Sequence, residues 1–148
     1  MYMLKFRPFE ADDNMVTVMA DTIADFIRKR PSHIDIIVPV PHSEARPRLH
    51  DLLECLSEQL NVPVSFDSIT RTRDVPAIKN IQDYDERVRL LQDAHRINPT
   101  RIAGKRVLLF DDVYRSGATM SSVARALYLE GSAKSVYRFA ITRTRSNR

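Results

Sequence analysis

Two adjacent carboxylates, Asp111 and Asp112, directly follow an apolar run at 107–110. A short, wholly apolar run is typical of a buried strand, so we expect the acid pair at a strand's end. Neighbouring residues of a strand point to opposite faces of the sheet. One carboxylate would then face a ligand, and the other would turn toward a neighbouring loop or a metal-bound water.

A loop rich in small and hydroxyl residues follows the acid pair and leads into a predicted helix. Its residues are Tyr114, Arg115, Ser116, Gly117, Ala118 and Thr119. Backbone N–H groups at the start of a helix bind anions, and a glycine lets the backbone approach a phosphate closely or take a positive φ. Carboxylates for a diol, with a phosphate cradle five residues further on, suit a ribose 5-phosphate. The alternative is an ordinary acidic turn before a capped helix.

Other phosphate-binding motifs do not fit this chain. The sequence has three glycines and contains neither GxxxxGK[ST] nor GxGxxG, which excludes a Walker loop and a dinucleotide fingerprint. A receiver-type acidic pocket would place its acid pair after the first strand rather than a late one. A further glycine, Gly131, stands where a helix C-cap glycine belongs.

Apolar periodicity predicts the elements that position these residues. The predicted helices span 15–30, 49–60 and 119–130, and the predicted strands span 34–38, 62–66, 107–110 and 136–141. This alternation indicates an α/β fold with a mostly parallel central sheet flanked by helices. Ligands of such sheets bind beyond the carboxyl ends of the strands. We therefore expect the site in the segments 39–48, 67–79 and 111–119.

Length and composition favour one domain spanning residues 1–148, because domains typically have about 100–200 residues. The lone Cys55 cannot form a disulfide within the chain and is expected to behave as a small core residue. No apolar run approaches the roughly 20 residues needed to span a bilayer, and the start MYMLKFRPFE lacks the layout of a signal peptide. We expect a cytoplasmic protein without a membrane segment. Three histidines are expected at the surface or the edge of the core, and they are His33, His50 and His95.

The net charge is concentrated in one segment. Residues 71–106 contain nine cations and five anions and so carry the whole net charge of +4, since the other 14 cations and 14 anions cancel. Such a segment attracts phosphates, either of a small polyphosphate or of nucleic acid. The alternative is a solvated surface segment. The basic tail at 143–148 is expected to be solvated, so binding of nucleic acid is conceivable but not favoured.

The pattern at 107–119 resembles the phosphoribosyl pyrophosphate (PRPP) binding motif of type I phosphoribosyltransferases: apolar strand, acid pair, then [TS]-G-x-T. The wider chain is similar to the ComF-type, competence-associated branch of that family. The similar segments are Val38-Pro39-Val40-Pro41, Arg71-Thr72-Arg73, Glu86-Arg87 and Ala94-His95-Arg96-Ile97. The RGFN-like segment of that branch appears only as Arg48-Leu49-His50-Asp51. The resemblance implies a Rossmann-like type I phosphoribosyltransferase fold with a small flap or hood.

The resemblance also implies roles for individual residues. Asp111 and Asp112 match the catalytic acid pair, which holds the ribose hydroxyls and Mg²⁺, directly or through water. The loop from Tyr114 to Thr119 matches the 5-phosphate site, although Tyr114 and Arg115 replace the family's usual small residues. The segment matching the pyrophosphate loop is Pro41, His42 and Ser43, and the matching flap cations are Arg71, Arg73, Lys79 and Arg87.

Three functions follow from these observations. The first is Mg²⁺-dependent transfer of phosphoribose from PRPP to a nitrogenous base or related acceptor, with release of pyrophosphate. The second is a non-catalytic, ComF-like protein that binds PRPP or a nucleotide and acts in regulation or DNA uptake through partners. The third is binding of nucleic acid through charge alone. No pattern names the acceptor, and a homodimer is expected from the resemblance only.

Overall fold

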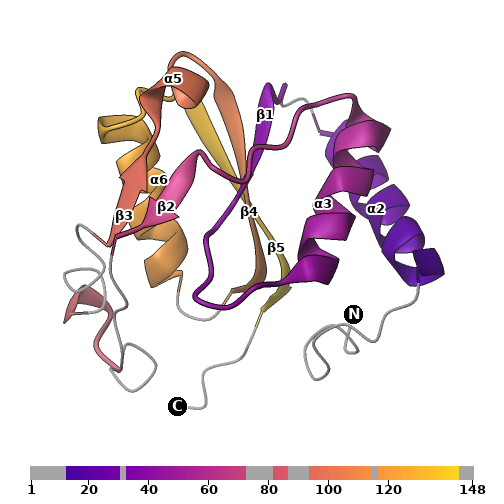
Figure 1. The fold of residues 1–148 in the computed structure, drawn as a ribbon, viewed down its shortest axis with the longest axis horizontal. Helices are drawn as coiled ribbons and strands as arrows, with labels where there is room; N and C mark the ends of the chain where they lie inside the picture. Colours follow the sequence, from indigo (N-terminus) through magenta and orange to yellow (C-terminus); the bar gives the residue numbers. More distant parts are fainter. Residues whose placement is uncertain (1–12, 31–32, 73–81, 87–93, 115–116, 144–148) are drawn as a thin grey trace.

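The computed structural model describes residues 13–30, 33–72, 82–86, 94–114 and 117–143. Helices and strands alternate along much of the chain and form three layers (Figure 1). The elements are α2 (Asp13–Arg28), β1 (Ile36–Pro39), α3 (Pro47–Leu60), β2 (Ile69–Arg71), β3 (His95–Ile97), α5 (Pro99–Ile102), β4 (Arg106–Tyr114), α6 (Ala118–Leu129) and β5 (Ser135–Arg143).

The central sheet is parallel and has the strand order β1-β4-β5. Ile37 of β1 is opposite Leu108 of β4, and Leu108 is opposite Tyr137 of β5. The strand predicted at 62–66 is reduced to one parallel bridge between Val64 and Ile37. The prediction of a mostly parallel sheet is therefore confirmed. The segment predicted as a strand at 62–66 contributes only this bridge to it.

Apolar side chains on both faces of the sheet explain why helices cover both of them. Ile37, Leu108 and Phe110 pack against α2 and α3 on one face. Val38 and Leu109 point to the other face and pack against α6, because side chains alternate along a strand. A parallel sheet buried on both faces reads as continuous apolar runs, which is why these strands were visible in the sequence.

A smaller antiparallel sheet, β2–β3, packs beside α6 (Figure 1). Ile69 of β2 and Ile97 of β3 lie in the same apolar cluster as Met120 and Val123 of α6. The sequence did not predict these three-residue strands. Between these two strands, the structure describes residues 82–86, with a helical turn at 84–86, and then residue 94.

Gly131 lies at the predicted place at the end of α6, but it does not have the left-handed conformation that is typical there. Gly131 follows the C-cap residue Glu130, but the left-handed residue is Ser132, with φ 55°. Gly131 is needed for another reason, because a β-carbon there would lie 2.7 Å from the carbonyl oxygen of Leu127. The reason for a glycine here is therefore the close packing of the chain against the end of the helix, and not a positive φ.

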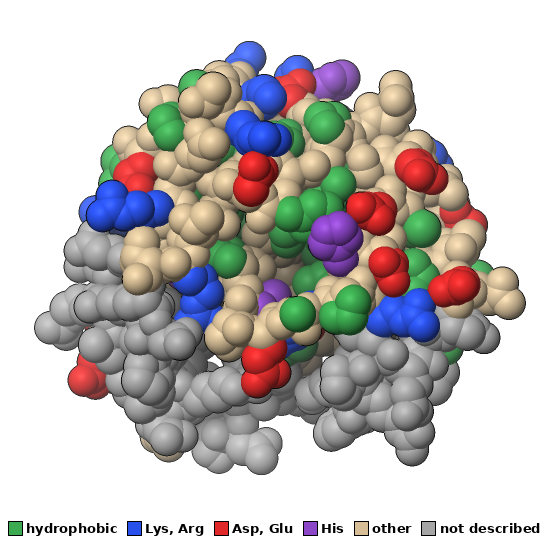
Figure 2. All heavy atoms as spheres, in the orientation of Figure 1, with side chains coloured by type: hydrophobic (Ala, Val, Ile, Leu, Met, Phe, Trp, Pro, Cys, Tyr) green, Lys and Arg blue, Asp and Glu red, His purple; other side chains and the backbone are tan. Residues whose placement is uncertain are grey.

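Three further observations concern an ion pair, the charge on the surface and the length of the helices. Asp35 and Arg106 form a two-pronged ion pair beside the start of β1, and this pair lowers the pKa of the Asp35 carboxyl well below its usual range. On the face in Figure 2, described acidic and basic side chains are interspersed rather than grouped by sign. Among the described residues, no helix is long and apolar enough to cross a membrane.

Candidate functional site

The loop after β1 and the end of β4 meet at one edge of the central sheet. The two strands are parallel and adjacent, so their carboxyl ends lie side by side. The backbone N–H of Val40 donates to the carbonyl of Phe110 at 2.8 Å, which fixes the start of the loop beside the acid pair. The edge predicted to hold the site thus gathers segments from 39–48 and 111–119.

The acid pair lies inside β4, not after it, since the strand continues to Tyr114. Asp111 and Asp112 are 7% and 9% exposed. The Asp111 carboxylate accepts the backbone N–H of Asp112 at 2.8 Å. The pairing with β5 passes from Asp111 to Val113, and the Thr142 hydroxyl donates to the carbonyl of Asp112 at 3.1 Å. The ladder is therefore interrupted at Asp112, where side chains supply the hydrogen bonds.

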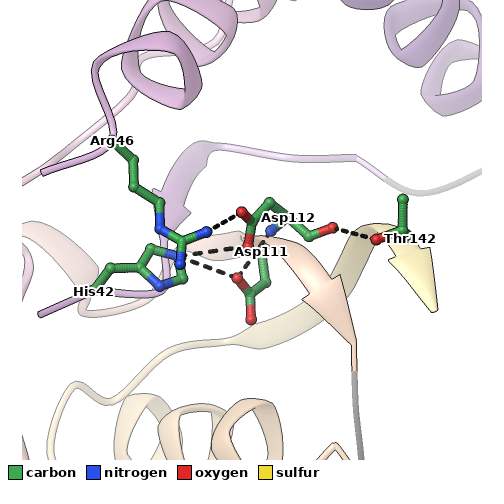
Figure 3. Close-up of polar contacts among 5 residues, drawn as sticks. All are labelled: His42, Arg46, Asp111, Asp112 and Thr142. Carbon is green, nitrogen blue, oxygen red and sulfur yellow. Dashed lines mark hydrogen bonds and ion pairs between the residues drawn. The ribbon is translucent and has the colours of Figure 1, made fainter. Parts of the chain in front are cut away.

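The orientation of the two carboxylates differs from the one predicted. Strand alternation predicted that they would point in opposite directions, but both lie close to His42. Its Nε2 atom is 3.2 Å from Oδ1 of Asp111 and 3.8 Å from Oδ1 of Asp112 (Figure 3). The Asp111 side chain folds toward the next residue's N–H, so local hydrogen bonding outweighs the alternation of an ideal strand.

A second side chain of the same loop, Arg46, reaches the acid pair. Its guanidinium forms an ion pair with Oδ2 of Asp112. Figure 3 shows Arg46 and His42 approaching from one side of the pair and Thr142 lying on the other. Arg46 is not among the site residues predicted from the sequence. The available signal was its place just before Pro47, the first residue of α3, at the end of the segment expected to contain the site.

The electrostatics of the pair reflect its burial. Desolvation raises the pKa of the Asp112 carboxyl and the neighbouring Asp111 adds to this, whereas Arg46 and His42 act in the opposite direction. The Nε2 atom of His42 is buried and has no hydrogen-bond partner among the described residues, although it lies within ion-pair distance of Asp111. The site thus holds concentrated negative charge together with a nitrogen that has no hydrogen bond.

The predicted phosphate end begins at Gly117, the N-cap of α6, which has φ 77°. This positive φ confirms the conformational role expected of the glycine. The Tyr114 side chain lies over Gly117, and the Arg143 guanidinium is 5.7 Å from the Tyr114 ring centre. Ala118 is buried and Thr119 half-buried at the helix start, while Arg115 and Ser116 lie outside the described residues.

The other predicted site residues are distributed as follows. Pro41 and Ser43 share the loop that carries His42. Of these three residues, His42 has the ionisable side chain, and it lies within ion-pair distance of the acid pair. Arg71 ends β2 and lies opposite His95 in the smaller sheet. The remaining flap cations, Arg73, Lys79 and Arg87, lie outside the described residues.

The donor atoms present fit a divalent cation. One ligand atom each from His42, Asp111 and Asp112 lies within 4.8 Å of the others. Mg²⁺ prefers oxygen ligands and commonly binds through one or two carboxylates, with water completing its shell. The two aspartates therefore fit Mg²⁺, with His42 suited to contact a metal-bound water rather than the ion.

The chain matches the sequence model of the phosphoribosyl transferase domain family over residues 9–143. It therefore belongs to this family, and the resemblance to type I phosphoribosyltransferases predicted from the acid pair and loop is confirmed at the level of the family. No curated protein sequence matches the chain.

Solved structures confirm the fold class at low sequence identity. The glutamine PRPP amidotransferase from B. subtilis, complexed with ADP and GMP, has a TM-score of 0.60 and 18% identity, with coverage of 93% of this chain and 29% of that one. Adenine phosphoribosyltransferase from Leishmania donovani has a TM-score of 0.59 and 15% identity, covering 89% and 54%. A hypothetical protein from Neisseria gonorrhoeae with bound ppGpp has a TM-score of 0.54 and 15% identity, covering 88% and 68%. The chain thus spans about a quarter to a half of the length of the first two.

Proposed function

We propose that this protein binds PRPP together with Mg²⁺ and transfers its phosphoribosyl group to a nitrogenous acceptor, releasing pyrophosphate. One observation carries the proposal. The two buried carboxylates of Asp111 and Asp112 converge beside the loop after β1, on the same edge of the sheet as the start of α6.

The two ends of this site suit the two ends of a ribose 5-phosphate. The aspartates accept hydrogen bonds from the ribose hydroxyls, because ionised carboxylates are acceptors only. The N-terminus of α6 offers backbone N–H groups and the positive end of the helix dipole to the 5-phosphate. Gly117, the N-cap of the helix, is five positions after Asp112 in the chain, a spacing that suits a single ligand with a diol and a phosphate.

Basic side chains on the β1–α3 loop and in the segment at 71–106 suit the leaving group. Pyrophosphate departs as a polyanion, and cations already in place stabilise the charge that develops on it. Arg46 and His42 already lie at the acid pair, and Arg71, Arg73, Lys79 and Arg87 are proposed to supply further charge. When bound, Mg²⁺ neutralises charge on the pyrophosphate oxygens. The protein's own part is to hold the ribose in the orientation that the transfer requires.

The finer assignments are proposals of the same kind. The segment Val38–Pro41, which leads from β1 into the site loop, supports placement in the ComF-like branch. The smaller sheet β2–β3, which carries Arg71 at the end of β2, is proposed to form the base of the flap. A homodimer stays a prediction.

A second function, binding of a nucleotide or PRPP without transfer, has its own support. Arg46 occupies an oxygen of Asp112, and Tyr114 lies over the start of α6 where the family has a small residue. The similar structure from Neisseria gonorrhoeae holds ppGpp, a ribose nucleotide that carries pyrophosphates. A regulatory protein of this fold would keep the acid pair and need no acceptor.

Thermal-shift titration with PRPP, with and without Mg²⁺, tests the proposal. A ligand at about 100 times its dissociation constant adds roughly 2.7 kcal/mol of stability, which is a readily visible shift. We expect a Mg²⁺-dependent shift in the wild type and none in the Asp111→Asn/Asp112→Asn variant. The control Glu130→Gln removes an exposed carboxylate at the far end of α6 and should keep the shift.

Pyrophosphate release with a panel of bases separates the candidate functions. Release that depends on both aspartates supports the transferase, whereas a PRPP shift without release from any base supports the binding protein. The absence of a shift at millimolar PRPP would overturn the transferase, and the absence of a shift with nucleotides as well would overturn the binding protein. Nucleic-acid binding through charge alone would persist in the double variant and weaken steeply with salt.

A further inference from the structure

The ion pair between Arg46 and Asp112 places a protein cation where the proposed function requires a metal cation. The guanidinium contacts Oδ2 of Asp112, and the imidazole of His42 lies within 4 Å of Oδ1 of both aspartates. All three contacts come from the β1–α3 loop, on one side of the pair (Figure 3). Oδ2 of Asp112 is therefore already engaged by the guanidinium.

We propose that Arg46 is an exchangeable counter-ion of the acid pair. It neutralises Asp112 in the ligand-free protein, competes with a divalent cation for that carboxylate, and leaves when the cation binds. The inference rests on the proposed function in one respect, that a divalent cation binds at Asp111 and Asp112.

The need for a counter-ion follows from burial. Two adjacent aspartates that are buried as whole residues lose most of the hydration of their carboxylates, and a buried charge without a partner costs several kcal/mol. Asp111 is partly satisfied by the backbone N–H of Asp112. Among the described residues, the ion-pair partners of the Asp112 carboxylate are Arg46 and His42. Without a metal, Arg46 is thus the permanent positive charge in contact with the pair.

The two partners differ in their freedom to move. The Asp112 side chain is 12% exposed and its backbone is held in β4 by Thr142. The Arg46 side chain is 39% exposed and so reaches the site from the solvent side. An incoming cation can therefore displace the guanidinium without disturbing the core, whereas Asp112 cannot follow it.

The backbone of Arg46 stays fixed while its side chain exchanges. Arg46 is the N-cap of α3, with Pro47 as the first helical residue, and its carbonyl accepts the backbone N–H of His50 at 3.0 Å. Its side chain makes no capping hydrogen bond. The released guanidinium consequently remains tethered at the edge of the site, where its charge is available to an anion that arrives with the cation.

Titration with Mn²⁺ alone, followed by the electron paramagnetic resonance signal of the free ion, tests this inference on the intact chain. We expect Arg46→Gln to bind Mn²⁺ about fivefold more tightly than the wild type, because the competing ion pair is gone. The matched control is Arg48→Gln. It removes the same charge two residues away, from a side chain that pairs with Asp13 and Asp51 rather than with the acid pair. Its Mn²⁺ affinity should stay within about twofold of the wild type.

A second measurement distinguishes exchange from a general effect of charge. Without metal, Arg46→Gln leaves Asp112 without its guanidinium, so its melting temperature should fall below that of Arg48→Gln, and Mn²⁺ should restore it. In an Asp112→Asn background, Arg46→Gln should change neither property.

Equal or weaker Mn²⁺ binding by Arg46→Gln, an equal gain in Arg48→Gln, or no Mn²⁺ binding by any of these proteins would overturn the inference. A PRPP shift in the wild type, measured separately, reports on the proposed function whatever the Mn²⁺ result.

Discussion

The aromatic ring of Tyr114 lies so close to Gly117 that a β-carbon on residue 117 would be 2.6 Å from Cζ of the tyrosine. Gly117 also has a left-handed φ of 77°. Two independent constraints therefore require glycine at the N-cap of α6. Together they allow a large side chain to end β4 directly beside the start of the helix.

Gly117→Ala should lower the free energy of unfolding by roughly 1–3 kcal/mol, because a β-carbon is both strained at this φ and in collision with Tyr114. Urea denaturation measures the change. In Tyr114→Ala the added β-carbon meets no ring, so Gly117→Ala should cost only the backbone part, about 1 kcal/mol, in that background. An equal cost in both backgrounds would show that the ring contact is unimportant.

Asp112→Asn should raise the free energy of unfolding at neutral pH, while abolishing PRPP binding. Burial raises the pKa of Asp112 in the folded protein, so folding disfavours the charged form of this carboxyl, and its ionisation lowers the stability of the fold. Loss of the half-exposed Arg46 pair offsets only part of this gain.

Chemical denaturation of Asp112→Asn and Asp111→Asn provides the comparison. An amide oxygen at position 111 still accepts the N–H of Asp112, so Asp111→Asn should keep the local backbone. A clear loss of stability in Asp112→Asn would mean that its ion pair with Arg46 outweighs the cost of burial.

The stability of the wild type should decline as pH falls from about 6.5 to about 4, because of His95. This side chain is 7% exposed on β3, and burial, with the nearby charge of Arg71, lowers its pKa to about 4. A histidine with a lowered folded pKa binds its proton more tightly in the unfolded chain. Its contribution is therefore complete above the unfolded pKa and is lost on acidification, here by on the order of 2 kcal/mol.

Urea denaturation at several pH values, on the wild type and His95→Gln, checks this. The variant should have a flatter profile between pH 6.5 and 4. The control His33→Gln removes an exposed histidine and should keep the slope of the wild type. Identical slopes in the wild type and His95→Gln would contradict the assignment.

The helices and the buried strands were predictable because their signals are local. The helices predicted at 15–30, 49–60 and 119–130 occur as Asp13–Arg28, Pro47–Leu60 and Ala118–Leu129. The apolar run at 107–110 is the centre of β4, and its polar continuation to Tyr114 was missed because two aspartates resemble a strand end. The three-residue strands β2 and β3 are too short to show a period, which left the burial of His95 unpredicted.

The sequence by itself determined the acid pair, the glycine at the start of α6 and the alternating elements around them, since each is a pattern within a few residues. Only the tertiary structure decided what faces the acid pair. Arg46 and Asp112 are 66 residues apart, and they meet because β1 pairs in parallel with β4. Strand pairing depends on how distant apolar surfaces pack together, and no local spacing of residues encodes that choice.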